Sequence, residues 1–213
     1  MLFDVRCPGC QRRGWCPCPR CVRELVSPEP AAIEGAVTTH VLFGHDGAGR
    51  EFIHAVKFAG DRAIVGWLGA ALATRVRGFG IDVVTWAPTS SKRRRERGFD
   101  QAKVLAAEVA KQLGVPNRSL LIRIGHRPQE GLGRSARLQG PKYEAKRRGS
   151  AQRVLVIDDV LTTGASLRAA VKALSDAGHG PIRAAAFSRA AGHGYATFEE
   201  IPAQGSVIDA GAA

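Results

Sequence analysis

The chain has 213 residues, of which 45% are hydrophobic, and it carries a formal net charge of +12. This length and composition suit one globular domain with a small additional segment. A membrane-spanning helix needs about 20 consecutive apolar residues, and a signal peptide needs an apolar core near the amino terminus. The sequence has neither feature, so we expect a cytoplasmic protein without membrane insertion. The excess of positive charge favours an anionic partner.

Four of the five cysteines form two Cys-x-x-Cys pairs. Cys7 and Cys10 make the first pair, and Cys18 and Cys21 make the second after seven intervening residues. This spacing lets four thiolates close a tetrahedral Zn²⁺ site, which would be structural because no coordination position stays open for catalysis. The alternatives are a redox-active pair, and a site in which Cys16 replaces one of the four. Because so short a segment has no core of its own, we expect the metal to supply its folding energy.

A linker and three regular elements are predicted next. The linker is Ser27-Pro-Glu-Pro-Ala31, in which Pro28 and Pro30 interrupt regular structure. Alternating apolar residues predict a strand from Ala36 to Phe43. Helical spacing and glycine stops predict one helix from Arg50 to Phe58 and a second from Asp61 to about Val76. We expect His54 and Lys57 to lie on a solvated helix face.

A second strand, Asp82 to Pro88, leads into a segment rich in hydroxyl groups and positive charge. Such a segment at the end of a strand can bind an anion. The alternative is a solvated start of a basic helix, although so many cations beside the positive end of a helix are unfavourable without an anion. The residues that we assign to this anion-binding loop are Thr89, Ser90, Ser91, Lys92, Arg93, Arg94, Arg95 and Arg97. Asp100 caps the following helix, which Gly114 ends.

A third strand, Leu120 to Ile124, precedes a basic segment from His126 to Arg153 that lacks hydrophobic periodicity. A loop of this length inside a compact domain is usually functional, often as a lid over a site. Residues 92–153 contain 17 basic and 5 acidic side chains, an excess equal to the net charge of the whole chain. The positive charge is thus concentrated here, where it could serve pyrophosphate, a nucleotide or single-stranded nucleic acid.

The stretch from Val154 to Ser166 combines a buried strand, two acids and a turn of small residues. Four apolar residues predict a parallel strand with Asp158 and Asp159 at its carboxyl end, where open α/β sheets bind ligands. The predicted turn consists of Thr162, Thr163, Gly164, Ala165 and Ser166. Apolar residues at helical spacing predict a helix from Leu167 to Ala177, ended by Gly178.

The turn and the acids together fit a phosphorylated pentose. A turn before a helix presents unpaired backbone N–H groups, the positive end of the helix dipole and hydroxyl donors, which suit a phosphate monoester. Adjacent carboxylates cannot hold phosphate, but they accept hydrogen bonds from sugar hydroxyls beside it. The alternative is a plain strand-turn-helix unit whose acids only cap the turn. A P-loop enzyme is not indicated, because no Gly-x-x-x-x-Gly-Lys motif is present.

Val154 to Ser166 resembles, over its whole length, the phosphoribosyl pyrophosphate (PRPP) signature of type I phosphoribosyltransferases. The resemblance implies that Asp158 and Asp159 are the catalytic acids and contact the ribose 2′- and 3′-hydroxyls. It implies that residues 162–166 hold the 5′-phosphate, that Mg²⁺ bridges pyrophosphate and ribose, and that Thr89 to Lys92 face the pyrophosphate. We expect an α/β fold with helices on both faces of a mostly parallel sheet, built from strands near residues 82, 120, 154 and 182.

From Cys7 to about Arg189 the chain resembles the ComF family, phosphoribosyltransferase-like proteins named for genetic competence. The matching features are the cysteine pairs, Ala55-Val-Lys-Phe-x-Gly-Asp61, Arg97-Gly-Phe-Asp-Gln101, the spacing of Gln129, Leu132 and Arg137, and the PRPP signature. The departures are Thr85-Trp-Ala-Pro88 in place of Val-Pro-Val-Pro, Asp100 in place of Asn, and Gln139-Gly-Pro141 where an Asn is usual. We expect a zinc-ribbon-like segment and linker in residues 1–30, a phosphoribosyltransferase-like domain in 31–190 and a tail in 191–213.

The ComF resemblance implies Mg²⁺-dependent PRPP binding in a protein related to DNA uptake, with phosphoribosyl transfer to an acceptor that no motif identifies. The alternative is a non-enzymatic competence module that binds single-stranded DNA with the same fold and works with DNA-uptake proteins. The residues assigned to basic contacts with pyrophosphate or nucleic acid are Arg93, Arg94, Arg95, Arg97 and Arg137.

Overall fold

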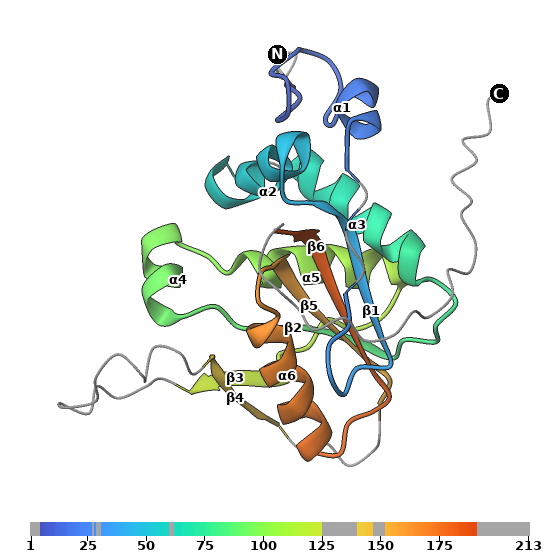
Figure 1. The fold of residues 1–213 in the computed structure, drawn as a ribbon, viewed down its shortest axis with the longest axis vertical. Helices are drawn as coiled ribbons and strands as arrows, with labels where there is room; N and C mark the ends of the chain where they lie inside the picture. Colours follow the sequence, from blue (N-terminus) through green and yellow to red (C-terminus); the bar gives the residue numbers. More distant parts are fainter. Residues whose placement is uncertain are drawn as a thin grey trace.

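A four-stranded parallel sheet forms the centre of the protein (Figure 1). The computed structural model describes residues 5–26, 28, 31–59, 62–124, 140–146 and 152–190. The strand order is β1-β6-β5-β2, with every neighbouring pair parallel. The strands are β1 (Thr38–Gly44), β2 (Val83–Trp86), β5 (Val154–Leu161) and β6 (Ile182–Arg189). The apolar runs in β5 and β6 suit central strands that are covered on both faces.

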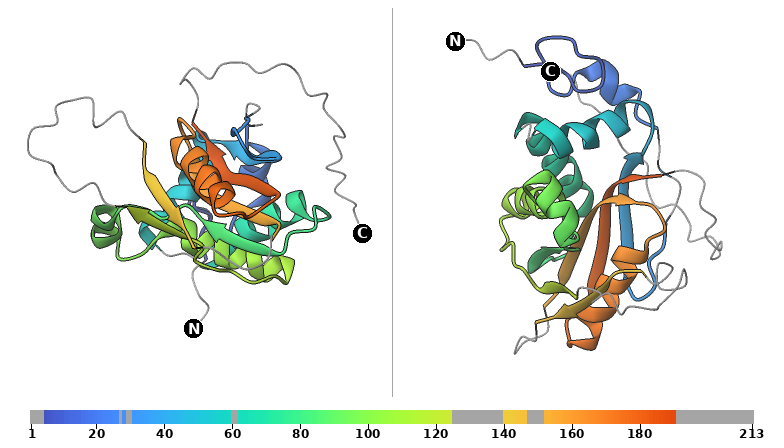
Figure 2. Two further views of the ribbon diagram at one scale, coloured as in Figure 1. Left: turned by 90° about the horizontal axis from the view of Figure 1, so that it is seen from below. Right: turned by 90° about the vertical axis from the view of Figure 1, so that its left-hand side faces the viewer.

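Helices cover both faces of this sheet (Figure 2). On β5, Leu155 and Ile157 belong to a core shared with α2, α3 and α5, whereas Val154 and Val156 belong to a second core shared with α6. Successive side chains of a strand point to opposite faces, so one strand supplies both cores. The helix bounds are α2 Gly47–Ala59, α3 Arg62–Val76, α5 Gln101–Leu113 and α6 Ala165–Asp176. The predicted fold class is confirmed.

The strand predicted near residue 120 does not join the main sheet. β3 (Leu121–Ile124) instead pairs antiparallel with β4 (Lys142–Ala145). In β3 only Leu121 is buried, while Ile122 and Ile124 are exposed, so the strand could not lie in a sheet covered on both faces. The sheet edge beside β6 is occupied by β1. Residues 125–139, between β3 and β4, lie outside the described part of the chain.

Each of the two helices after β2 is preceded by a side-chain cap and followed by a glycine. α4 (Ser91–Arg97) has Ser90 as its N-cap, and the Ser90 hydroxyl accepts a hydrogen bond from the Arg93 N–H. Gly98 then adopts a φ of 79°, a conformation that favours glycine. Asp100 caps α5 by accepting from the Lys103 N–H, which confirms the predicted cap.

The amino-terminal segment packs on the same core as α2 and α3. It contains the short helix α1 (Pro19–Arg23), and its Cys7 and Cys21 are buried. A Cβ on Gly9 would meet Cys21 Sγ at 2.9 Å and Ala48 Cβ at 3.3 Å, so the backbone approaches α2 closely there. Within the described ranges, no helix combines the length and the apolar character that a bilayer crossing requires. The predicted tail, residues 191–213, lies outside these ranges.

Candidate functional site

The two acids of the PRPP signature lie near the carboxyl end of β5. The strand runs four residues beyond the apolar stretch that ends at Ile157, because β6 pairs with it as far as Leu161. Asp158 Oδ1 accepts a hydrogen bond from the Asp159 N–H at 2.9 Å, and Asp159 Oδ1 accepts from the Val160 N–H at 2.8 Å. One oxygen of each carboxylate is therefore held by the backbone, and the two carboxyl groups also interact with each other through their side chains.

Strand alternation places the two acids in different surroundings. Asp158 follows the residues that face α6 and β4, and its charge acts on Tyr143 of β4. Asp159 follows the residues that face α2, and its Oδ2 lies 3.9 Å from Lys57 Nζ on that helix. A ligand at the end of β5 would thus contact one carboxylate on each side of the strand.

Burial raises the pKa of Asp158 well above its usual value, and the neighbouring charge of Asp159 raises it further. Desolvation and a like charge both disfavour the ionised form of a carboxyl group. Perturbed carboxyl groups at the carboxyl end of a parallel sheet are frequent at ligand-binding sites.

The turn after β5 is shorter than predicted. Thr162, Thr163 and Gly164 connect the strand to α6, and Ala165 and Ser166 already belong to the first turn of that helix. Gly164 has a φ of 71°, and a Cβ there would meet Ile33 Cδ1 at 2.9 Å, so both conformation and space require glycine. A sharp turn of this kind directs the amino-terminal N–H groups of α6 toward the end of β5, where an anion can bind.

Tyr143 connects this turn to the end of β2. Its hydroxyl donates to the Pro88 carbonyl at 3.2 Å and forms a hydrogen bond with the Ser166 side chain. Burial raises the pKa of Tyr143 to about 12, so the phenol is neutral at physiological pH. Sequence analysis assigned Tyr143 no role, because Lys142-Tyr-Glu-Ala145 is too short to predict a strand within the long basic segment.

The segment after β2 is organised by Asp100. Its Oδ2 accepts a hydrogen bond from the Thr89 N–H at 3.0 Å, while Oδ1 caps α5. Burial raises the pKa of Asp100, and the charge of Asp159 adds to the effect. Asp100 therefore brings a third carboxyl group near the two acids of β5, at a position where the ComF motif has an uncharged Asn.

The basic residues of α4 lie on a solvent-exposed helix. The side chains of residues 91–96 are exposed, and Lys92 makes only a loose ion pair with Glu96, at 4.0 Å. Ser90 uses its hydroxyl as a helix cap. For Lys92, Arg93, Arg94 and Arg95, the ligand-free structure agrees with the alternative interpretation, a solvated basic helix, rather than with an anion-binding loop. Arg97 is half-buried and donates to Gln101 Oε1 at 2.7 Å.

Not every basic residue between positions 92 and 153 lies at the carboxyl end of β5. Arg153 precedes β5 at its amino end and forms an ion pair with Asp82 at 2.7 Å, at the opposite end of the strand from Asp158. Arg137, which was predicted to be a site residue, lies outside the described residues.

Lys57 and His45 are site residues that sequence analysis missed. Lys57 was expected on a solvated face, but its side chain is 19% exposed and faces Asp159. His45 follows β1 and hydrogen bonds through Nδ1 to Ser188 Oγ at 2.8 Å; burial, followed by the charge of Lys57, lowers its pKa. The available signal for Lys57 was its place in the stretch from Ala55 to Asp61, one of the features that resemble the ComF family.

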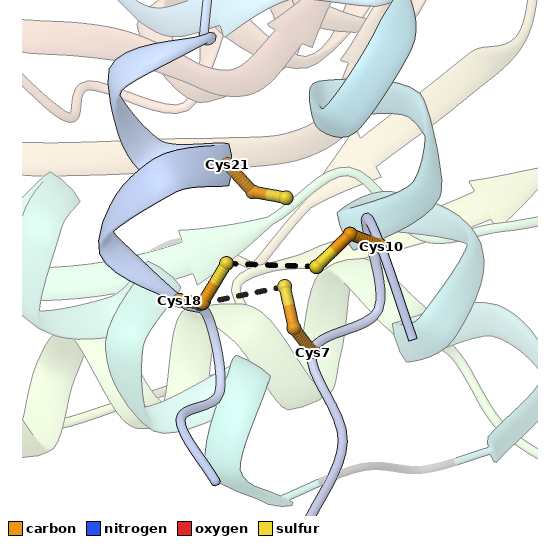
Figure 3. A group of neighbouring side chains, drawn as sticks. All are labelled: Cys7, Cys10, Cys18 and Cys21. Carbon is orange, nitrogen blue, oxygen red and sulfur yellow. Dashed lines mark hydrogen bonds between the residues drawn. The ribbon is translucent and has the colours of Figure 1, made fainter. Parts of the chain in front are cut away.

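A second site is formed by the cysteine pairs (Figure 3). The Sγ atoms of Cys7, Cys10, Cys18 and Cys21 all lie within 4.8 Å of one another, and those of Cys10 and Cys18 are 3.6 Å apart. Four sulfurs bound to one Zn²⁺ at about 2.3 Å would be about 3.8 Å apart in a tetrahedron. The geometry and the donor set both fit a closed structural zinc site.

The position of Cys16 supports the assignment of these four ligands. Cys16 is not part of the four-sulfur group in the described part of the chain. Among the four thiols, a hydrogen bond from the Cys21 backbone lowers the pKa of Cys18 to about 7, whereas burial raises the pKa of Cys21, so a metal ion would bind Cys21 by displacing its proton. The interpretation of Cys16 as a replacement ligand is therefore not supported by the geometry.

We predict that the purified protein carries about one Zn²⁺ per chain by elemental analysis. Cys10→Ser should remove most of this metal and lower the melting temperature, because metal binding contributes to folding. Cys16→Ser is the matched control and should retain the zinc. Loss of zinc in the Cys16 variant alone would contradict the ligand assignment.

We also predict that Asp158→Asn stabilises the ligand-free protein at pH 7.5. The folded state retains the Asp158 proton at a pH where the unfolded state has lost it, so rising pH through that window lowers the free energy of unfolding. The Asp158→Asn variant has no proton to lose in this range of pH, so its free energy of unfolding does not fall in this way. Its amide oxygen can still accept the hydrogen bond from the Asp159 N–H. Its melting temperature should exceed that of the wild type by a few degrees, as about 1 kcal/mol produces in a chain of this size.

The pH dependence provides the control for this prediction. The difference in melting temperature should shrink as the pH is lowered from 7.5 to 4.5, since the wild-type carboxyl group then gains its proton. Effects of pH on the cysteine site are shared by both proteins and cancel. A difference that does not change with pH would show that Asp158 is not held in an unfavourable ionised state.

Comparison with known proteins relates residues 100–199 to the phosphoribosyl transferase domain, whose family model matches this segment. The segment begins at Asp100 and includes β5, the turn and most of the described site. A comparison with curated protein sequences gives no match.

Several solved structures are similar over part of the chain. The glutamine PRPP amidotransferase from B. subtilis, complexed with ADP and GMP, is 27% identical with a TM-score of 0.41; the match covers 57% of this chain and 25% of the amidotransferase. The APRTase from Giardia lamblia, complexed with 9-deazaadenine, is 23% identical with a TM-score of 0.43, covering 61% of this chain and 69% of that protein. The chain thus spans only about a quarter of the amidotransferase. Residues 100–199 are thus similar to the phosphoribosyl transferase domain, and the observed α/β fold with its parallel sheet agrees with this similarity.

Proposed function

We propose that the protein binds PRPP together with Mg²⁺ at the carboxyl end of β5. The observation that carries this proposal is the position of Asp158 and Asp159 beside the glycine turn that begins α6. Carboxylate oxygens accept hydrogen bonds from a vicinal diol, and a helix amino terminus binds a phosphate group. A phosphorylated ribose offers both groups at neighbouring positions.

The geometry supports the following proposed roles for the residues of the site. Thr162, Thr163 and Ser166 supply hydroxyl donors to the 5′-phosphate, with the backbone N–H groups at the start of α6. Asp158 and Asp159 hold the ribose hydroxyls through the carboxylate oxygens that the backbone does not use. Tyr143 positions Ser166 and keeps the turn against Pro88.

We expect Mg²⁺ to bind this site together with the phosphorylated ligand and not to bind the protein alone. In the described ranges, the cysteine cluster is the sole group of three or more side chains able to hold a metal. Mg²⁺ usually binds one or two carboxylates together with substrate phosphates. Asp158 and Asp159 are the residues that would stand next to it, and the bound ion would neutralise charge on the pyrophosphate.

We further propose that the bound phosphoribosyl group is transferred to a nucleophilic acceptor. The bond between ribose C1′ and pyrophosphate breaks, its electron pair leaves with pyrophosphate, and the acceptor forms the new bond to C1′ and loses a proton. Cations around the leaving group would stabilise its developing negative charge. The chemical class of the acceptor is not specified by this proposal.

PRPP with Mg²⁺ should raise the melting temperature. At about a hundred times its dissociation constant, the ligand should add roughly 2.7 kcal/mol to stability, which corresponds to about 5–10 °C. The double substitution Asp158→Asn and Asp159→Asn should lose most of this shift, because a carboxylate accepts stronger hydrogen bonds from hydroxyls than an amide does.

The matched control is Asp176→Asn. Asp176 is an exposed acid of α6 that pairs with Lys172 on the helix surface, so its substitution should preserve the PRPP-induced shift. An undiminished shift in the Asp158/Asp159 double variant would show that these acids do not touch the ligand. Release of pyrophosphate from PRPP in the presence of candidate bases and amines tests the transfer step separately.

A second candidate function is the binding of single-stranded DNA, which the ComF resemblance implies. The observation that favours it is α4, where Lys92, Arg93, Arg94 and Arg95 are exposed in succession. Flexible cations on a helix that extends from the domain (Figure 1) are suited to a phosphate backbone, and few aromatic side chains are available for base stacking. Sequence preference should therefore be weak.

If α4 binds single-stranded DNA, the logarithm of the affinity should fall with the logarithm of salt concentration by about 0.7 per phosphate contact. Replacement of Arg93, Arg94 and Arg95 by Ala should reduce this slope by up to about two units, with little change in melting temperature because exposed charges contribute little to folding. Undetectable DNA binding at low salt would exclude this function for the isolated chain. Competition between DNA and saturating PRPP is expected if α4 also faces the pyrophosphate.

A further inference from the structure

Lys57 occupies a fixed position at the edge of the proposed PRPP site. It lies in the last turn of α2, whose Phe52, Ile53 and Val56 are fully buried in the core. Its own side chain is 19% exposed, in contrast to the 82% of Lys92 on α4. The backbone that carries Lys57 is therefore rigid, and the ammonium group is directed into the protein rather than into solvent.

The ammonium group of Lys57 is incompletely paired. Within the described residues, its ion-pair partner is Asp159, and the Nζ–Oδ2 distance of 3.9 Å is too long for a hydrogen bond. No acceptor in the described part of the chain is thus recorded within hydrogen-bonding distance of its three N–H donors. A half-buried cation without hydrogen bonds costs free energy, unless a ligand supplies the missing acceptors.

The groups that face Lys57 add positive potential. Burial lowers its pKa, the charge of Asp159 opposes this effect, and Arg97 and Arg93 from the α4 side lower the pKa again. Asp158 contributes a small opposing effect, and the nearby His45 has a lowered pKa and so favours its neutral form. When a ligand engages Asp158 and Asp159, cations of α2 and α4 dominate this side of the site.

Strand alternation determines which part of the ligand lies here. The turn and Ser166, proposed to hold the 5′-phosphate, lie on the side of β5 that faces α6 and Tyr143. Lys57 lies on the other side, with Asp159. A second anionic group that lies across the sugar from the 5′-phosphate would therefore reach Lys57 and not the turn. In PRPP that group is the pyrophosphate.

We propose that Lys57 is a ligand-binding residue that donates hydrogen bonds to a pyrophosphate oxygen on the α2 side of the site. This inference rests on the proposed binding of PRPP and adds a contact from an element that precedes residues 100–199, the segment matched by the phosphoribosyl transferase domain. It gives α2 a direct part in ligand recognition, whereas Lys92, Arg93, Arg94 and Arg95 of α4 are exposed in the ligand-free protein.

The test compares the affinities of the full-length protein for PRPP and for ribose 5-phosphate, each with Mg²⁺, by calorimetry. Lys57→Met retains the aliphatic stem and removes the charge. It should bind PRPP about 10- to 100-fold more weakly, as expected on loss of a hydrogen bond to a charged group. Its affinity for ribose 5-phosphate, which lacks pyrophosphate, should stay within about twofold of the wild type.

The matched control is Lys111→Met, which removes an exposed lysine of α5 that pairs only with Glu108 in the described residues. It should bind both ligands as the wild type does. Lys57→Met should not melt at a lower temperature than the wild type, because it removes a desolvated charge. A second measurement uses only the wild-type protein. PRPP should slow the chemical acetylation of the Lys57 amine, which mass spectrometry detects, and ribose 5-phosphate should not slow it.

The outcomes distinguish a failure of the role of Lys57 from a failure of the proposed PRPP binding. If the wild type binds PRPP and Lys57→Met binds it equally well, or if PRPP does not protect the Lys57 amine, the role of Lys57 is wrong while PRPP binding stands. Equal losses of affinity for both ligands would also contradict a pyrophosphate contact. If the wild type binds neither ligand, the proposed function fails, and this inference fails with it.

Discussion

The parallel pairing of β5 between β2 and β6 is the constraint on which the rest of the structure depends. Parallel strands end at a common edge, so the acids of β5, the turn before α6, Thr89 after β2 and His45 after β1 are brought together there. Both faces of β5 are buried, which fixes its register through two separate cores. A shift by one residue would exchange Asp158 and Asp159 between the two sides of the strand.

The site contains several partly buried charged groups that are only partly compensated in the ligand-free protein. Burial, with the charge of the neighbouring Asp159, raises the pKa of Asp100 and Asp158, and Lys57 faces Asp159 without a hydrogen bond among the described residues. A protein selected only for stability would replace such groups by apolar ones. Their presence together, in a fold with tightly packed cores, supports the proposed binding site.

The cysteine segment is joined to this site through α2. Gly9 approaches both Cys21 and Ala48, in the first turn of α2, and Lys57 lies in the last turn of the same helix. Cys7 and Cys21 belong to the core that also holds Phe52 and Ile53. A metal that orders the cysteines would therefore also support the helix that presents Lys57, so the segment is packed against the domain rather than merely tethered to it.

The sequence by itself determined the elements whose signals are local. The apolar run before Asp158, Gly164, the Asp100 cap and the two cysteine pairs each predict a strand, turn, helix or metal site from neighbouring residues, and the structure has the corresponding geometry. Long-range packing decided the rest. Only the fold shows that β1 and not β3 joins the sheet, that Arg153 lies at the opposite end of β5 from Asp158, and that Tyr143 and Lys57 converge on the acids. Such contacts join residues far apart in the sequence, 102 positions for Lys57 and Asp159 and 145 positions for the paired Thr38 and Arg183, and no local pattern encodes which distant elements will pack together.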